Sequence, residues 1–286
     1  MANKELETSA ASMVGERIAR QFASLPQVEA VAVAGSQTAQ FADAASDIDL
    51  YVYVTEDIPL DERARIAARS PHAEIGNTTW EPGDEWIDAV TGTPVDVMYR
   101  HVGWIEEQLD RVLVRHEASV GYSTCFWYNV LHSRALFDRM DWFATLQKRA
   151  RVSYPPELRK AILAKNYPLL RRNQSSYLHQ IELAVKRNDP VSVNHRVTAL
   201  LASYFDVLFA VNELPHPGEK RILERANASC RRLPGGMEAQ VRQLLGSPDG
   251  VVGHINALVD GLDDLLVSEN LMPKDGLDRA PIRGRP

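Results

Sequence analysis

The chain has 286 residues, of which 45% are hydrophobic and 24% are charged, a composition typical of a soluble globular protein with one large or two ordinary domains. Its formal net charge of -6 argues against DNA or tRNA as a partner, because proteins that follow a long phosphate backbone usually present a basic surface. No stretch approaches the roughly 18 uninterrupted apolar residues of a membrane helix, so no membrane partner is expected.

The compartment is predicted from the N-terminus and the cysteines. The opening MANKELETSA is polar and acidic, unlike a secretory signal peptide. Cys125 and Cys230 form neither a CxxC pair nor a zinc motif. We therefore expect a cytoplasmic protein with two reduced thiols.

The first half of the chain mixes helical and strand patterns. The expected elements, in chain order, are a helix at 6–25, strands at 28–33 and 48–54, a helix at 60–68, strands near 74–80 and 93–99, a helix at 102–116 and an edge strand near 135–137. They predict a small mixed sheet covered by helices.

From Pro155-Pro156 onward the strand patterns vanish and long helical patterns take over. The expected helices are 158–186, bent at Pro168, then 191–211, 219–228, 237–245 and 251–266. Helices joined by short loops favour a bundle. The sequence thus predicts an α+β fold, with a catalytic domain at 1–150, a helical bundle at 151–272 and a disordered tail at 273–286.

Two aspartates open the strand predicted at 48–54. Side chains in a strand alternate between faces, so Asp47 and Asp49 point the same way. Adjacent carboxylates repel each other, and a bound cation removes that cost; Mg²⁺ typically sits on one or two carboxylates plus substrate phosphates. The turn at Gly35 and Ser36 offers backbone N–H groups and a hydroxyl to a phosphate. Together these residues predict a nucleoside triphosphate site.

A third acid, Asp96, lies in the apolar segment VDVMYR. The ordered set Gly35, Ser36, Asp47, Asp49 and Asp96 resembles the DNA polymerase β-like nucleotidyltransferase superfamily. The resemblance implies an NTP substrate, with ATP favoured, held through two Mg²⁺ ions on the three aspartates. Gly35 and Ser36 would hold the phosphates, and Asp96 would ligate metal, act as general base, or do both. If Asp96 is not the third acid, Glu81, Asp84 and Glu85 are the next candidates.

The resemblance extends over roughly residues 28–225. The segments EPGDEW, VDVMYR, GYSTCFWYNVLHS, LFDR and LFAVNELPHPGEKR resemble a bacterial group in which this domain is fused to an uncharacterised helical domain. Its distant relatives include the aminoglycoside and lincosamide nucleotidyltransferases. Such a likeness implies a fold and a reaction class and leaves the acceptor open.

One lysine of the second half is a candidate phosphate ligand. The turn Pro217-Gly218 predicts that Glu219 and Lys220 begin a helix, whose N–H groups favour anions. In related transferases a lysine of the helical domain reaches the triphosphate, which implies this role for Lys220. The alternative is a surface lysine paired with an acid.

The leading hypothesis is therefore transfer of a nucleoside monophosphate from an NTP to a hydroxyl of a small molecule. A toxin–antitoxin or regulatory module that modifies a protein or RNA partner is the alternative. Arg172 and His179, seven apart on one predicted helix, resemble the pair of HEPN-type ribonucleases and leave RNA cleavage as a further possibility. The simplest reading makes Asp47, Asp49 and Asp96 ordinary surface acids. Oligomeric state and acceptor identity stay open.

Overall fold

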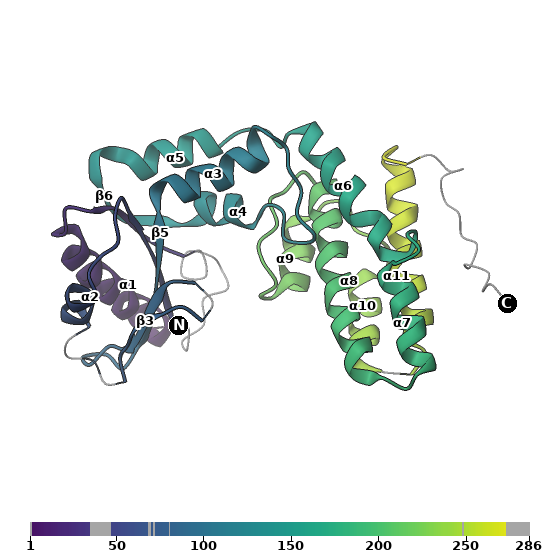
Figure 1. Cartoon of the computed structure of the whole chain (residues 1–286), viewed down its shortest axis with the longest axis horizontal. Coiled ribbons are helices and arrows are strands. Elements are labelled where there is room, and N and C mark those ends of the chain that lie inside the picture. The colour runs from purple at the N-terminus through teal and green to yellow at the C-terminus, as the bar shows by residue number, and fades with distance from the viewer. Residues whose placement is uncertain are drawn as a thin grey trace. The chain divides into compact units, whose positions relative to one another are not determined.

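The computed structural model describes residues 2–34, 47–67, 70, 72–79, 81–247 and 249–272, with side chains from residue 12 onward. The fold is α+β, which confirms the predicted class. The chain divides into two compact units, one of Met1–Arg115 with Phe126–Ser153 and the other of His116–Cys125 with Tyr154–Pro286 (Figure 1). The predicted range 1–150 placed residues 116–125 in the first domain, whereas they belong to the second unit together with most of the predicted range 151–272. The tail predicted at 273–286 lies outside the described residues.

The first unit contains a six-stranded sheet in the order β3-β4-β5-β2-β1-β6. Its strands are β1 (Val28–Val33), β2 (Ile48–Val54), β3 (Glu74–Asn77), β4 (Gly83–Ile87), β5 (Pro94–His101) and β6 (Arg134–Asp138). Among the described strands, β2 and β5 form the one parallel pair, and the other neighbours are antiparallel. Strand β6 lies at an edge, where the sequence predicted it.

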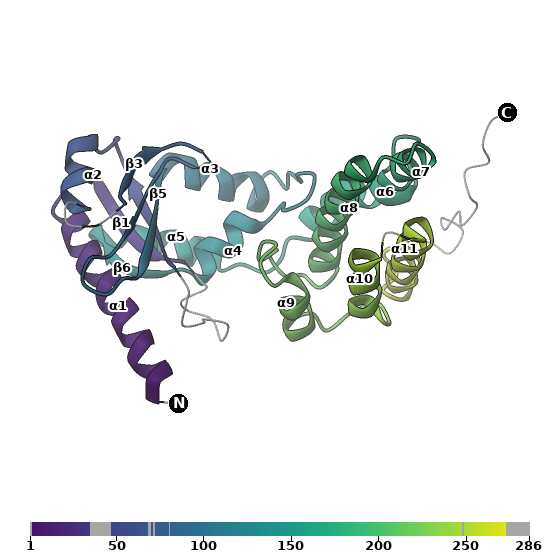
Figure 2. The same cartoon turned by 90° about the horizontal axis from the view of Figure 1, so that it is seen from below.

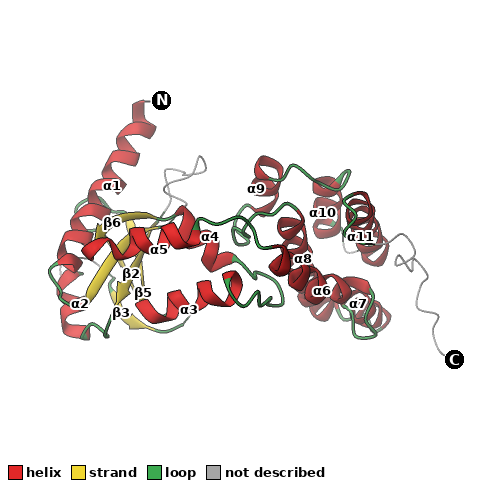
Figure 3. Cartoon of the chain, turned by 90° about the horizontal axis from the view of Figure 1, so that it is seen from above, coloured by secondary structure: helices red, strands yellow, loops and turns green. Residues whose placement is uncertain are grey.

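Helices cover both faces of this sheet (Figure 3). Helices α1 (Ala2–Ala23) and α2 (Leu60–Ile66) lie on the face formed by Ile48, Leu50 and Val52 of β2, with Val14, Ile18 and Phe22 of α1 in the same apolar core. Helices α3 (Val102–Leu113), α4 (Cys125–His132) and α5 (Trp142–Ala150), preceded by the 3₁₀ turn Arg139–Asp141, belong to the other face. There the ring of Tyr53 stacks on that of Phe143 at 5.3 Å. Alternation along β2 thus gives each face its own core.

The second unit contains helices α6 (Pro156–Arg171), α7 (Tyr177–Lys186), α8 (Pro190–Val211), α9 (Ile222–Ser229), α10 (Met237–Gly246) and α11 (Val251–Ser268). Figure 2 shows α6, α7 and α8 grouped beside α10 and α11. Helix α8 supplies the centre of the apolar core, which all six helices share. None of the described helices combines the length and the apolar character needed to cross a bilayer.

Several predicted boundaries were wrong. The helix predicted at 158–186 is two helices, because the chain breaks after Arg171 and restarts where Ser176 accepts a hydrogen bond from the His179 backbone N–H. Pro168 stays inside α6. Arg172 and His179 therefore do not share one helical face, which removes the basis of the ribonuclease hypothesis. The sequence reading also missed β4, α4 and α5.

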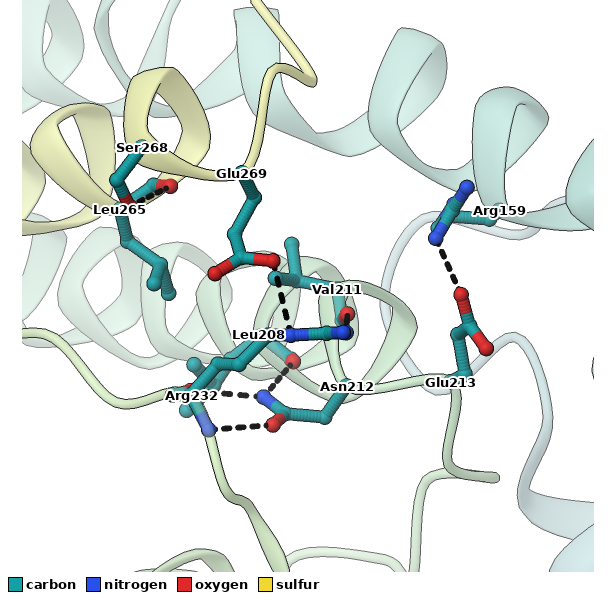
Figure 4. Close-up of polar contacts among 9 residues, drawn as sticks. All are labelled: Arg159, Leu208, Val211, Asn212, Glu213, Arg232, Leu265, Ser268 and Glu269. Atoms are coloured by element: carbon teal, nitrogen blue, oxygen red, sulfur yellow. Dashed lines mark hydrogen bonds and ion pairs between the residues drawn. The ribbon is translucent and has the colours of Figure 1, made fainter.

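Polar side chains fix the C-terminal end of α8 (Figure 4). The Asn212 amide donates to the carbonyls of Leu208 and Arg232, and the Arg232 guanidinium donates to the Val211 carbonyl at 2.9 Å and pairs with Glu269 at 2.9 Å. These donors satisfy carbonyls that a helix end leaves without an intrahelical partner. The contacts tie α8 to the chain before α10 and to the end of α11.

A buried carboxylate holds residues 116–125 in the second unit. Asp206 of α8, 1% exposed, accepts hydrogen bonds from the Ser123 N–H at 3.0 Å, the Ser123 hydroxyl at 2.6 Å and the Asn166 amide at 3.0 Å. The Asn166 carbonyl oxygen accepts from the Gly121 N–H at 2.8 Å. Burial raises the pKa of Asp206 to about 6, against the opposing effect of the two Ser123 hydrogen bonds.

We expect two buried groups of this unit to make the free energy of unfolding depend on pH in opposite directions. The raised pKa of Asp206 makes its contribution to stability complete below pH 3.8 and lost as pH rises through about 6. Burial lowers the pKa of His216 to about 4, so its contribution is present above pH 6.5 and lost as pH falls through about 4. Asp206→Asn removes the first effect alone. As pH falls from 6.5 to 4, the free energy of unfolding of this variant should decrease by up to about 3 kcal/mol more than that of the parent.

Urea unfolding followed by circular dichroism measures this slope. The control is Asp57→Asn, which changes an exposed aspartate of the first unit. Equal slopes for Asp206→Asn and the parent would contradict the assignment of a raised pKa to Asp206.

Candidate functional site

The parallel pair β2 and β5 brings two predicted site residues together. Asp49 and Asp96 are direct partners in its register, and both are half-buried. Neighbouring strands are about 4.8 Å apart and register partners point to the same face, so the two carboxyl groups stand side by side. The strand of Asp96 thus lies beside the strand of Asp49, as a metal site shared by these aspartates would require. The roles of the three acids in catalysis stay predictions.

The same face carries more acids in line with this pair. Glu85 of β4 is the register partner of Asp96, and Glu74 of β3 is the partner of Glu85. We call Asp49, Asp96, Glu85 and Glu74 the acid row; it crosses four adjacent strands. Asp47 lies two residues before Asp49 and is exposed, as are Glu85 and Glu74. Like charges directly opposite each other destabilise a sheet, so the row is a place where a cation would relieve repulsion.

Two of the alternative acids, Asp84 and Glu81, form ion pairs with arginines of the first unit. Asp84 is fully buried and pairs with Arg63 at 2.5 Å, while the Tyr99 hydroxyl donates to its carboxylate at 2.6 Å. Burial and the Asp84 carboxylate raise the pKa of Tyr99, which keeps that hydroxyl protonated as a donor. Glu81 accepts two hydrogen bonds from Arg100, both at 3.0 Å. Of the three alternatives, Glu85 alone shares the register position of Asp96.

Of the residues predicted to bind phosphate, the structure describes Lys220 but not Gly35 or Ser36. Gly35 and Ser36 lie outside the described residues. Lys220 is exposed and belongs to the second unit, whereas the aspartates belong to the first. The prediction that Glu219 and Lys220 begin a helix was wrong, because α9 starts at Ile222 with Arg221 as its N-cap in a left-handed conformation. Both residues lie in the turn before that helix.

The donors of the acid row suit a hard cation. Carboxylate oxygens are the ligands of Mg²⁺, which takes one or two of them and fills its remaining positions with water and substrate phosphates. Within the described part of the chain, no group of three or more His, Cys, Asp or Glu residues is gathered closely enough to enclose a metal ion. The residues present therefore fit an ion shared with a phosphate substrate better than an ion enclosed by protein alone.

A large cavity of the first unit lies away from Asp49 and Asp96. It measures about 870 Å³ and is lined by Val54, Arg63, Tyr99 and His101 among others. Val54 and His101 are register partners at the far ends of β2 and β5, five residues beyond Asp49 and Asp96, or roughly 16 Å along the strands. The cavity is therefore distant from Asp49 and Asp96, although Asn77, which also lines it, donates a hydrogen bond to Glu85 of the acid row at 3.2 Å.

Comparison with solved structures gives distant likenesses, one of which is described here. The chain is similar to the solved structure of a nucleotidyltransferase-like protein from Exiguobacterium sibiricum, with 15% sequence identity and a TM-score of 0.42. The match covers 88% of this chain and 73% of that chain. The likeness is too distant to assign an activity or a site residue. No protein-family model matches the chain, and no curated protein matches it.

The acid row predicts a stability effect that does not depend on substrate. Glu85→Gln removes the charge between Glu74 and Asp96 and keeps the oxygen that accepts from the Asn77 amide. We expect the free energy of unfolding at low ionic strength to rise by about 0.2–1 kcal/mol. Urea unfolding measures the change, with Glu56→Gln, an exposed acid after β2, as control. A Glu85→Gln variant less stable than the parent would show that the carboxylates of the acid row do not repel one another.

Proposed function

We propose that the first unit is a Mg²⁺-dependent nucleotidyltransferase domain, which moves a nucleoside monophosphate from an NTP, ATP being favoured, to a hydroxyl of a small molecule. The register pairing of Asp49 with Asp96 is the observation that carries the proposal. It joins two acids from distant parts of the sequence, on one face, in the pattern that the motif resemblance implies. A nucleic-acid acceptor is disfavoured by the net charge of -6.

In this proposal the side chains have distinct tasks. Asp47 and Asp49 would hold one Mg²⁺ ion for the triphosphate, and Asp96 would complete the site of a second ion. When bound, the metal neutralises the charge that builds on the phosphates. The acceptor oxygen attacks the α-phosphorus, a new P–O bond forms, and the bond to the leaving pyrophosphate breaks. Asp96, as general base, removes the acceptor proton.

Three further residues belong to the proposal on sequence grounds. Gly35 and Ser36 would hold the β- and γ-phosphates through backbone N–H groups and a hydroxyl. Lys220 would add a positive charge to the triphosphate. We expect Lys220→Ala to weaken NTP binding more than Ser36→Ala, because a charge-assisted hydrogen bond is stronger than a neutral one. Titration calorimetry with a non-hydrolysable NTP compares them, and a Lys220→Ala affinity equal to the parent's would remove Lys220 from the site.

The metal ligands are tested by removing one charge at a time. Asp47→Asn and Asp49→Asn keep the side-chain shape, so the fold should survive while nucleotide transfer falls by orders of magnitude. The assay follows pyrophosphate release from labelled NTPs with a library of small hydroxyl compounds, and Glu56→Gln serves as an exposed control. Turnover near the parent level in either asparagine variant would contradict the proposal.

Asp96 is tested by separating binding from transfer. Asp96→Asn should still bind Mg-NTP, through Asp47 and Asp49, but transfer nothing, because the acceptor proton then has no base within reach. Equilibrium binding and single-turnover transfer are measured on the same preparation. Loss of nucleotide binding would reduce Asp96 to a ligating or structural residue. Retained transfer would make Glu85, its register partner, the next base to substitute.

A further inference from the structure

An arginine at the end of α6 lacks the acidic partner that similarly buried arginines have. Arg172 is the half-buried residue that follows α6, and it forms no ion pair within the part of the chain that the structure describes. Arg63, Arg100 and Arg171 are also buried or half-buried, and each pairs with a carboxylate. A charge withdrawn from water without a partner is costly. The positive charge of Arg172 is therefore left uncompensated by the described chain.

An aromatic ring fixes the position of this charge. The guanidinium carbon of Arg172 lies 4.8 Å from the centroid of the Tyr167 ring. Tyr167 is buried, and its hydroxyl donates to the carboxylate of Asp263. Asp263 and Asp260 are both bound in turn by Arg171. A cation–π contact holds a guanidinium without using its hydrogen-bond donors, so Arg172 is held in place with donors to spare.

The donors of Arg172 differ in their access to a partner. Its Nη2 is enclosed by the protein, whereas Nη1 also lacks a partner within the described chain but is not enclosed. Nη1 carries two N–H groups. An acceptor from outside the protein can therefore bind at Nη1 and compensate the charge of the whole guanidinium.

Arg172 and Tyr167 line a pocket of about 410 Å³, formed by α6 and the residues that follow α11. Small-molecule sites range from about 300 to 1,000 Å³. Two more cations, Arg159 and Lys160, line the pocket, and among the described residues no acid does. The rest of its wall is mostly apolar and consists of Leu163, Ala164, Pro168, Asn270, Leu271 and Met272.

One of the three cations of the wall is compensated within the protein. Arg159 pairs with Glu213 at 2.5 Å (Figure 4). Lys160 is exposed and, like Arg172, has no acidic partner among the residues that the structure describes. The pocket thus offers two positive charges without a counter-ion, in a chain whose formal net charge is -6.

We propose that this pocket binds an organic carboxylate, with its apolar body against Leu163, Leu271 and Met272 and its carboxylate bound by Arg172. A hydrogen bond between a guanidinium and a carboxylate is charge-assisted and stronger than a neutral one. Lys160 adds a second attraction. An inorganic anion would leave the apolar wall unused, and a neutral ligand would leave Arg172 uncompensated. The proposal does not rest on the transfer reaction, because every residue of the pocket belongs to the second unit.

Three probes test the proposal on the full chain: cinnamate, an aromatic carboxylate; cinnamamide, its neutral analogue of the same shape; and inorganic phosphate, an anion without an apolar body. Ligand-observed NMR titrations give the dissociation constants, and phosphate is added as a competitor. We expect cinnamate to bind about tenfold more tightly than cinnamamide, the lower end for a hydrogen bond to a charged group. Added salt should lower this ratio, because it screens the charges. Phosphate at the same concentration as cinnamate should not displace it.

Matched variants locate the binding. Arg172→Leu should reduce the affinity for cinnamate to that for cinnamamide. Arg187→Leu makes the same change at the exposed residue that follows α7, outside the pocket wall, and should leave both affinities unchanged. Leu163→Phe narrows the pocket and should weaken binding of both probes. Leu178→Phe, at a partly buried position outside the wall, should not.

These measurements decide the proposal even if one variant fails to fold. If Arg172→Leu does not fold, the cinnamate-to-cinnamamide ratio of the parent and the effect of Leu163→Phe decide. The proposal is overturned by equal affinities for the two probes in the parent, or by cinnamate binding at parent strength in a folded Arg172→Leu or Leu163→Phe variant. Displacement of cinnamate by an equal concentration of phosphate also overturns it, because the apolar wall would then contribute nothing.

Discussion

The first unit depends on the parallel register of β2 and β5. A parallel pair sets every residue of one strand beside a fixed residue of the other, so Asp49 meets Asp96 with no freedom to move apart. A slip of one residue would turn Asp96 to the opposite face and break the cores on both sides of the sheet. Burial of Leu50 and Val97 on the α1 face therefore fixes the meeting of the acids on the other.

Acids elsewhere in this unit are arranged differently. Asp84 and Asp88 are buried and pair with Arg63 and Arg17, and Glu81 pairs with Arg100. Each of those carboxylates has a guanidinium that compensates its desolvation, the usual condition for burying a charge. The acid row instead sets carboxylates opposite one another on successive strands. Both arrangements of carboxylates thus occur within one sheet.

The sequence predicted the strands with the clearest patterns and missed β4, whose pairing depends on residues distant in the sequence. Apolar β-forming residues fill β1 and β2, so their bounds could be read directly. Strand β4, with Gly83, Asp84 and Glu85, is poor in such residues and exists because β5 pairs with it, so the alignment of Glu85 with Asp96 was beyond local patterns. The helix predicted to continue through a bend at Pro168 instead ends after Arg171, and a new helix begins where Ser176 caps it. Pro168 itself is tolerated inside α6, where it removes only one hydrogen bond.

The second unit uses interior polar groups in two ways. The Asp206 carboxylate accepts three hydrogen bonds and so attaches residues 116–125 to α8; a fully satisfied network of this kind fixes structure. His216 lies near that network and is satisfied at its backbone N–H and at Nδ1, but not at Nε2. The network holds Tyr122 and Thr124 in place around the ring. The hydrogen bonds to Asp206 therefore also fix the surroundings of the His216 ring.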